Sequence, residues 1–213
     1  MTNRKTGLIG GTFNPVHYGH LFLAEQAMEY CHLDQVLFIP SGISYMKNVR
    51  EIASAEDRLQ MVRLATENHP DFRVSSVETD RPGESYTCET LLALSREYAD
   101  TRFYFIIGAD NLFSIEKWKE PAEIFRRCTL VAAFRGDEAR SALEEKAEDL
   151  YHKYQAEIIL LPKRRIDISS TEIRQRITEK RSIRYMVPEP VRNYITEPVS
   201  YTHLRAHETL RHL

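Results

Sequence analysis

The sequence of 213 residues predicts an α/β protein: a doubly wound parallel sheet followed by a small C-terminal helical cap. Two observations lead to this fold class. Short apolar runs alternate with amphipathic stretches along most of the chain, which is typical of strands joined by crossover helices. The apolar runs show little alternation with polar residues, as expected for strands whose two faces are both covered by helices.

Six short apolar runs are expected to form the sheet. The clearest are Val-Leu-Phe-Ile at 36–39 and Phe-Tyr-Phe-Ile-Ile at 103–107. The predicted strands are Thr6–Gly10, Gln35–Ile39, Phe72–Val77, Arg102–Ile107, Thr129–Ala133 and Glu157–Leu161.

The stretches between these runs have a helical pattern. Ser54 and Asp57 have the spacing of a capping box, with Asp in place of the usual Glu. From Ser169 onward the pattern is helical only, so we expect one domain over residues 1–197 with a helical part at 169–197. The predicted helices are His20–Cys31, Ala55–Glu67, Cys88–Tyr98, Pro121–Arg127, Ala139–Tyr154, Ser170–Glu179 and Pro188–Ile195.

The composition limits the classes of function. A formal net charge of −2 argues against a nucleic-acid partner bound by bulk electrostatics. No run of about 18 apolar residues occurs, so we expect no membrane-spanning helix. Three scattered cysteines and the lack of a signal peptide predict reduced thiols and a cytoplasmic location. Residues 198–213 hold three of the eight histidines without apolar periodicity, and are expected to be a disordered or non-native tail.

The most informative segment runs from Gly10 to His20, between a predicted strand and a predicted helix. Its paired glycines allow the backbone to approach a ligand closely, and the helix start offers an anion site. His17 and His20 are three residues apart, so they share one helix face if the helix has already begun at His17. This pattern favours polyphosphate binding. Two alternatives are half of a zinc site, which would need three or four ligands, and ordinary histidines on a helix surface.

Further polar residues follow the other predicted strands. Because ligands bind beyond the carboxyl ends of strands in such sheets, these residues are expected to converge at one edge. Around Ser169 the sequence reads as a second capped helix start, and Arg174, one turn inside, could grip phosphate bidentately. A well-capped helix without a ligand is the alternative. Residues at the strand ends are Lys47 after the second strand, Gly108 and Asp110 after the fourth, Arg135 after the fifth, and Arg164, Arg165 and 168–174 after the sixth.

Two stretches resemble known signatures. Residues 10–20 resemble the GxFxPxHxGH signature of the nucleotidyltransferase superfamily, and Ile168–Arg174 resembles the ISSTxIR signature of its adenylyltransferases. The chain resembles bacterial nicotinate-mononucleotide adenylyltransferases over about residues 6 to 196, with blocks at Ser85–Leu91, Gly108–Asn111 followed by Lys117-Trp118, and Tyr185–Val191. It departs from them after the second strand, where Ser44-Tyr45-Met46-Lys47 replaces Pro-Pro-His-Lys, so only the lysine carries over.

The resemblance implies a Rossmann-like fold and the transfer of AMP from ATP to nicotinate mononucleotide, which gives deamido-NAD and pyrophosphate. The attacking phosphate has a second pKa of about 6 and is already ionised at neutral pH, so no general base is required. Mg²⁺ is expected to be held by substrate and water, with no metal ligands from the protein.

The resemblance also implies residue roles. His17 and His20 would hold the α-phosphate, and Lys47 and Arg174 the leaving pyrophosphate. Asp110 would contact a ribose hydroxyl or the magnesium shell, or else cap a helix. ATP-binding residues would be Gly10, Gly11, Thr12, Phe13, Gly108, Asp110, Ile168, Ser169 and Ser170, and mononucleotide-binding residues would be Tyr86, Thr87, Trp118 and Arg135.

Other functions remain open at this point. One is a phosphopantetheine adenylyltransferase or a cytidylyltransferase, although such chains are usually shorter and lack the Tyr-Thr and Lys-Trp blocks. Another is an idle nucleotide-binding module that senses nucleotides or scaffolds a partner. The sequence leaves open the preference for nicotinate or nicotinamide mononucleotide, and also the oligomeric state, for which the family suggests a homodimer.

Overall fold

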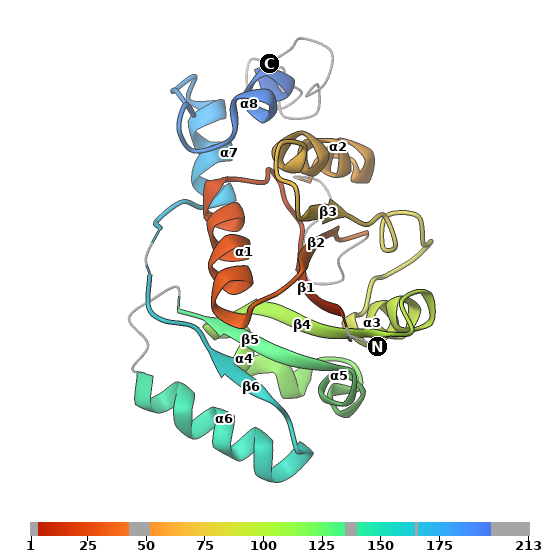
Figure 1. The fold of residues 1–213 in the computed structure, drawn as a ribbon. Coiled ribbons are helices and arrows are strands. Elements are labelled where there is room, and N and C mark those ends of the chain that lie inside the picture. The colour runs from red at the N-terminus through yellow and green to blue at the C-terminus, as the bar shows by residue number, and fades with distance from the viewer. Residues whose placement is uncertain (1–3, 43–51, 135–139, 165, 197–213) are drawn as a thin grey trace, which may run out of the picture.

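The computed structural model describes residues 4–42, 52–134, 140–164 and 166–196. In these residues a six-stranded sheet has the order β3-β2-β1-β4-β5-β6, and every neighbouring pair is parallel. Helices cover both faces of the sheet (Figure 1). The prediction of a Rossmann-like, doubly wound parallel sheet is therefore confirmed.

All six predicted strands are present, with shifted ends. Strand β3 is three residues shorter than predicted, because the chain turns at Ser76, whose carbonyl accepts the Asp80 N–H at 2.8 Å. The strands are β1 (Arg4–Gly11), β2 (Gln35–Pro40), β3 (Phe72–Val74), β4 (Thr101–Gly108), β5 (Cys128–Ala133) and β6 (Ile158–Leu160).

The predicted helices also form, and one further helix was missed. The stretch after β4 was expected to be a loop, but it forms a short helix and a 3-10 turn. Ala109, Leu112 and Ile115 are fully buried at a spacing of three, so packing against the sheet holds this stretch helical. The helices are α1 (Tyr18–Cys31), α2 (Ala55–Thr66), α3 (Thr87–Glu97), α4 (Ala109–Ser114), η2 (Ile115–Lys117), α5 (Pro121–Arg127), α6 (Arg140–Tyr154), α7 (Ser170–Thr178) and α8 (Glu189–Thr196).

Two apolar cores lie on opposite faces of the sheet. Consecutive strand residues go to different cores: Leu8 packs in the core under α3 to α6, and Ile9 in the core under α1, α2, α7 and α8. In β4, Phe105 packs in the same core as Leu8, and Ile106 packs in the same core as Ile9. Burial on both faces explains why the strands read as continuous apolar runs.

The strand order places a crevice next to β1. From β1 the chain winds outward through β2 and β3 on one side, and returns to β4, β5 and β6 on the other. The connections after β1 and β4 therefore leave the sheet on opposite faces, which opens a space beyond their carboxyl ends. In Figure 1, α1 and α4 flank this edge.

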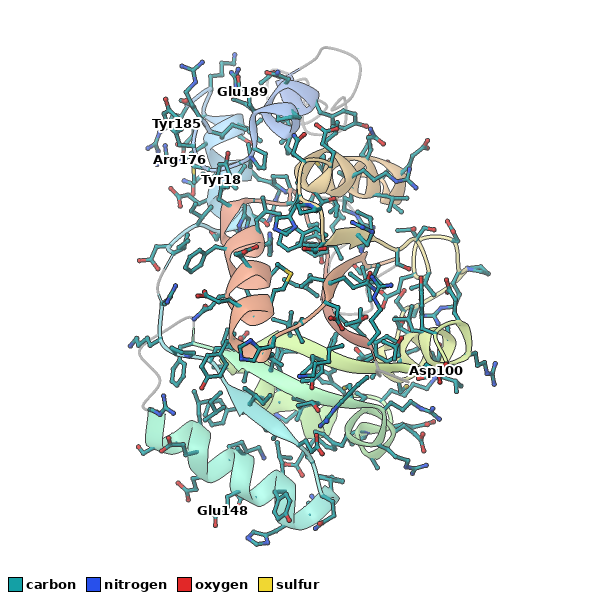
Figure 2. All side chains as sticks on the ribbon, viewed as in Figure 1. Tyr18, Asp100, Glu148, Arg176, Tyr185 and Glu189 are labelled. Carbon is teal, nitrogen blue, oxygen red and sulfur yellow. The ribbon has the colours of Figure 1, made fainter. Side chains whose placement is uncertain are left out.

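The C-terminal helices pack beside the first two. The Tyr194 hydroxyl on α8 donates to Asp57 Oδ1 on α2 at 2.8 Å. The backbone N–H of Tyr18 at the start of α1 donates to the Met186 carbonyl at 3.0 Å. Charged side chains of both signs lie at the surface, with Arg176 and Glu189 at the end of the molecule opposite Glu148 (Figure 2).

The expectations about membrane-spanning helices and about the cysteines can be checked in the residues that the structure describes. None of the helices in them is both long and apolar enough to cross a bilayer. Cys31, Cys88 and Cys128 are buried free thiols, and burial raises the pKa of the Cys128 thiol to about 12. The predicted tail at 198–213 lies outside the described residues.

Candidate active site

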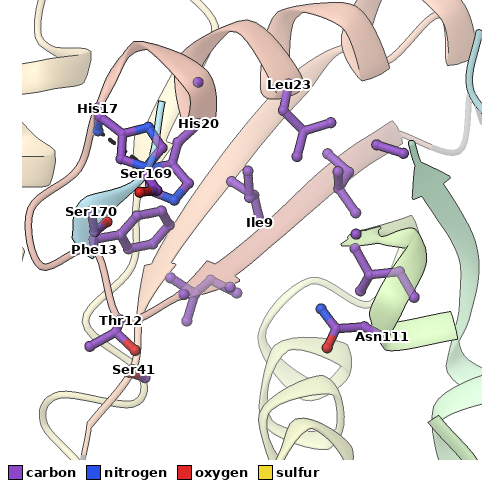
Figure 3. Close-up of a pocket in the computed structure, with 18 of the residues that line it drawn as sticks. Ile9, Thr12, Phe13, His17, His20, Leu23, Ser41, Asn111, Ser169 and Ser170 are labelled. Carbon is purple, nitrogen blue, oxygen red and sulfur yellow. Dashed lines mark hydrogen bonds between the residues drawn. The ribbon is translucent and has the colours of Figure 1, made fainter. Parts of the chain in front are cut away.

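The main cavity lies at the carboxyl ends of β1 and β4 and has a volume of about 1040 Å³. It is lined by the loop after β1, the start of α1, the start of α4 and the segment leading into α7. Figure 3 shows the histidines of α1 beside the serines of α7, with Asn111 reaching in from α4 on the other side. The two helix starts singled out in the sequence therefore share one cavity.

The loop after β1 brings two imidazoles together. Helix α1 starts at Tyr18, earlier than predicted, so His17 is its N-cap and His20 lies in its first turn. Their rings stack with centroids 3.7 Å apart and planes at 24°. His17 is only 5% exposed, which rules out an ordinary surface histidine. Within the described ranges no group of three or more His, Cys, Asp or Glu side chains could hold a metal, so the zinc alternative has no support there.

A backbone hydrogen bond sets the tautomer of His20. The backbone N–H of His17 donates to His20 Nδ1 at 3.3 Å. Because Nδ1 accepts, the proton of the neutral ring lies on Nε2, which becomes a donor. The ring is also packed edge-on against Phe13, with centroids 5.0 Å apart. His20 is thus held as an oriented N–H donor.

Gly19 allows the stacked pair to form. A Cβ on Gly19 would lie 3.0 Å from His17 Nδ1 and 3.1 Å from His17 Cε1. It would also lie 3.5 Å from the carbonyl oxygen of Ile168, in the segment before α7. The absence of a side chain at position 19 leaves room for the His17 ring and the second helix tip to approach α1 together.

The start of α7 is hydrogen-bonded directly to the loop after β1. Ser169 caps α7 by accepting the Glu172 N–H at 3.1 Å. The Ser170 hydroxyl donates to the Pro15 carbonyl at 2.9 Å, and Arg174 Nη1 donates to the Asn14 carbonyl at 2.9 Å. These bonds join residues more than 150 positions apart and hold both helix tips at one site.

The far end of the cavity is formed by residues from the start of α3, from the end of η2 and from the segment after β3. Thr87, at the start of α3, and Trp118 both line it, and the indole meets the Phe105 ring edge-on with centroids 6.3 Å apart. The Glu78 carboxylate also lines this end and accepts a hydrogen bond from Thr90 Oγ1 at 2.7 Å. Burial raises the pKa of Glu78, against the opposing effect of the Thr90 hydrogen bond.

Some predicted site residues lie elsewhere. Asp110, in the first turn of α4, is exposed and does not line the cavity, whereas its neighbour Asn111 does. Tyr86 is also absent from the cavity wall: its hydroxyl bonds Glu84, and its ring lies 4.2 Å from Lys119 Nζ. Lys47, Arg135 and Arg165 fall outside the described residues. The predicted residues that do line the cavity are Gly10, Gly11, Thr12, Phe13, His17, His20, Thr87, Gly108, Trp118, Arg164, Ile168, Ser169, Ser170 and Arg174.

Sequence reasoning missed three polar residues in or behind the cavity. The Asn14 side chain is 4% exposed, and its Oδ1 accepts the Ala53 N–H at 3.2 Å. Its place inside the Gly10–His20 segment was the only signal. Glu78 directly follows the predicted strand Phe72–Val77, so its position at a strand end was a signal that sequence reasoning did not use. Arg58 looked like an ordinary residue of an amphipathic helix.

These features define a class. A parallel sheet with a crevice at its switch point, two converging helix starts and paired imidazoles make an α/β nucleotide-binding protein of the nucleotidyltransferase type. The family model described as cytidylyltransferase-like matches residues 8–176. A "Probable nicotinate-nucleotide adenylyltransferase" of Lachnoclostridium phytofermentans is 44% identical over 192 residues, covering 90% of this chain and 96% of the relative. One of the same name from Dehalococcoides mccartyi is 41% identical over 198 residues, covering 92% and 97%.

The chain therefore belongs to the cytidylyltransferase-like family and, within it, to the nicotinate-nucleotide adenylyltransferases. Solved structures support the fold. A Plasmodium falciparum nicotinic acid mononucleotide adenylyltransferase complexed with NaAD superimposes with a TM-score of 0.69 at 16% identity, covering 96% of each chain. The same protein complexed with APC gives a TM-score of 0.70 at 16% identity, covering 90% of this chain and 94% of the other.

Proposed function

We propose that this protein transfers the adenylyl group of ATP to the 5′-phosphate of nicotinate mononucleotide, releasing pyrophosphate and deamido-NAD. The observation that carries the proposal is the single cavity containing stacked His17 and His20, the α7 tip with Arg174 and, at its far end, Trp118. The names of the relatives support the choice of substrate. The reaction is a step in the synthesis of NAD.

The transfer requires alignment and charge stabilisation. A phosphate oxygen of the mononucleotide attacks the α-phosphorus of ATP, and the bond from that phosphorus to the β-bridging oxygen breaks. The nucleophile's second pKa is about 6, so it carries its charge without a base. Oriented N–H donors at the α-phosphate are the main contribution that the chain can make. His20 Nε2 is one such donor, and His17 beside it is the second.

The leaving pyrophosphate needs cations and backbone donors. Arg174 uses Nη1 on the Asn14 carbonyl, so its guanidinium is fixed beside the first loop with further N–H groups available. Lys47 is proposed as a second cation, by resemblance. Backbone N–H groups at Gly11–Thr12 and Ser169–Ser170 complete the anion site, in keeping with the positive ends of α1 and α7.

The nucleoside parts would use the remaining lining residues. We assign the adenosine to the residues Gly10, Phe13, Gly108 and Ile168, with Asn111 in place of the exposed Asp110 as the nearer ribose contact. The pyridine ring would stack on Trp118 near Thr87. Arg135 stays a mononucleotide-binding prediction, and Tyr86 would need to turn from Glu84 to reach the ring.

ATP enters as its Mg²⁺ complex, with the metal held by phosphate oxygens and water. The phosphate end of the cavity presents imidazoles, hydroxyls and the Arg174 guanidinium, which can donate to phosphate oxygens, beside the acidic residues Asp167 and Glu172. Mg²⁺ is thus part of the substrate in this proposal. We expect neither a nucleic-acid partner nor a role for the buried cysteines.

Pyrophosphate release tests the proposal. The purified protein is given ATP with nicotinate mononucleotide or nicotinamide mononucleotide, and in parallel with phosphopantetheine or with CTP in place of ATP. His20→Ala should lower kcat by about 10²–10⁴, the range for one well-placed donor, while His152→Ala on exposed α6 should not. Release only with phosphopantetheine or CTP would favour the other transferases. If no substrate pair releases pyrophosphate, the protein is better explained as a nucleotide-binding module without transferase activity.

A further inference from the structure

A buried arginine lies behind the phosphate-binding loop. Arg58 belongs to the first turn of α2 and is 2% exposed. Arginine is rarely buried to this extent, because desolvating a guanidinium is costly unless its N–H groups are hydrogen-bonded. The hydrogen bonds of Arg58 therefore indicate what its burial achieves.

Arg58 donates to three backbone carbonyls. Its Nε bonds the Ala53 oxygen at 3.1 Å, Nη1 the Thr12 oxygen at 3.0 Å, and Nη2 the Gly42 oxygen at 3.1 Å. Thr12 lies in the loop after β1, Gly42 in the segment after β2, and Ala53 just before α2. The guanidinium is planar and rigid, so it fixes these three segments relative to one another.

The same polar network reaches Arg174. The Asn14 side chain accepts the Ala53 N–H at 3.2 Å, and the Asn14 backbone carbonyl accepts from Arg174 Nη1 at 2.9 Å. Hydrogen bonds therefore run from Arg174 on α7, through Asn14 and Ala53, to Arg58 on α2. The loop between Thr12 and Asn14 is held by an arginine from each side.

Gly42 extends the network toward the far end of the cavity. A Cβ on Gly42 would lie 2.4 Å from the Glu78 carbonyl oxygen, so the two backbones are in close contact. Glu78 also lines the cavity, and its carboxylate accepts a hydrogen bond from Thr90 on α3, the helix that begins at Thr87. By bonding both Thr12 and Gly42, Arg58 connects the backbone at the phosphate end with a segment that packs against the mononucleotide end.

We propose that Arg58 is a positioning residue for adenylyl transfer, which aligns the loop after β1 without contacting either substrate. The C=O and N–H of a trans peptide point in opposite directions, so anchoring the Thr12 carbonyl also fixes the direction of the Phe13 N–H. Arg58 thereby sets how the backbone donors of this loop face the triphosphate. This inference rests on the proposed function for its catalytic readout, but its effect on ATP binding can be measured separately.

The test compares Arg58→Lys with Arg63→Lys. Lysine keeps the charge at position 58 but loses the rigid fork, and Arg63 is an exposed arginine on the same helix. Arg58→Lys should lower kcat per folded molecule by about 10-fold to 100-fold, the range expected when reacting groups shift by up to an ångström. It should also weaken calorimetric binding of a non-hydrolysable ATP analogue by a larger factor than it raises the KM for nicotinate mononucleotide, because Arg58 bonds the loop after β1 directly and reaches the mononucleotide end only through Gly42. Arg63→Lys should match the wild type in each measurement.

The outcomes separate the two proposals. If the wild type releases no pyrophosphate with either mononucleotide, the proposed function fails, and the analogue-binding comparison decides on Arg58 alone. The positioning role is overturned if Arg58→Lys binds the analogue and turns over like Arg63→Lys. It is also overturned if Arg58→Lys and the more apolar Arg58→Met lose thermal stability but keep a normal kcat per folded molecule. The same conclusion follows if neither variant folds. Either result would make Arg58 a purely structural residue.

Discussion

Replacing Gly19 with alanine should separate activity from stability. The new Cβ would lie 3.0 Å from His17 Nδ1, whereas comfortable contacts of this kind are about 3.5–4.0 Å. The His17 ring must therefore move by roughly 0.5 Å or more. Since a misplacement of about 1 Å can cost 10²-fold, we expect kcat to fall about 10-fold, equivalent to about 1.4 kcal/mol in the barrier.

The stability of this variant should change little or rise. Gly19 lies in the first turn of α1, and alanine is favoured over glycine in helices by about 0.5–1 kcal/mol, which offsets part of the new contact. Steady-state pyrophosphate release and thermal melting, measured on the same preparation, are the assays. Glu29→Ala on the exposed face of the same helix is the control. A Gly19→Ala variant with wild-type kcat, or with a kcat loss that follows a loss of folded protein, would refute the reasoning.

Three further perturbations test other parts of the molecule. Trp118→Ala should raise the KM for the mononucleotide more than the KM for ATP, and equal effects in steady-state kinetics would argue against ring stacking. Hydrogen bonds from Lys146 and then Lys153 lower the pKa of Glu116 to about 2 from 4.5, so their stabilisation is present above pH 4.5 and is lost toward pH 2. Glu116→Gln should lower the free energy of unfolding, measured with urea, by about 1 kcal/mol at neutral pH. If the wild type and the variant still differ by this amount at pH 2, the stabilisation does not come from the Glu116 charge. Burial raises the pKa of Glu78 above 4.5, so the wild type should lose stability as the pH rises above that value. Glu78→Gln should lack this loss when the free energy of unfolding is measured across pH. If the stabilities of the wild type and the variant change with pH in parallel, Glu78 is not the cause.

The fold could be predicted because its signals are local. Each strand is a short apolar run, and two of the helices begin with a capping serine: Ser54 accepts the Asp57 N–H at 3.0 Å, and Ser169 accepts the Glu172 N–H at 3.1 Å. Helix α4 was missed because a helix of six residues offers little more than one turn of periodicity. The burial of Ala109, Leu112 and Ile115 reflects the sheet beneath them, which a local pattern does not report.

The candidate site was predictable where one contiguous segment carries the chemistry. His17, His20 and the glycines before them lie within eleven positions and predict an anion site together. The partners that hold this segment come from distant parts of the chain: Arg58 bonds Thr12, Ser170 bonds Pro15, and Arg174 bonds Asn14. All three bonds have backbone carbonyls as acceptors, and a carbonyl is present at every position whatever the residue. Residue identities therefore cannot show which carbonyl an arginine or serine will reach.

The requirements of adenylyl transfer explain why several side chains that do not need to contact substrate hold the loop after β1. If the attacking phosphate is already ionised, the chain gains little from a base and must lower the barrier through fixed donors. Donors lower a barrier only when their own positions are held, to within about 0.5 Å. The imidazoles are held by stacking, by the His17 N–H and by the space at Gly19, and the backbone before them by Arg58 and Arg174. Losing one of these supports should therefore reduce turnover while the two cores keep the fold intact.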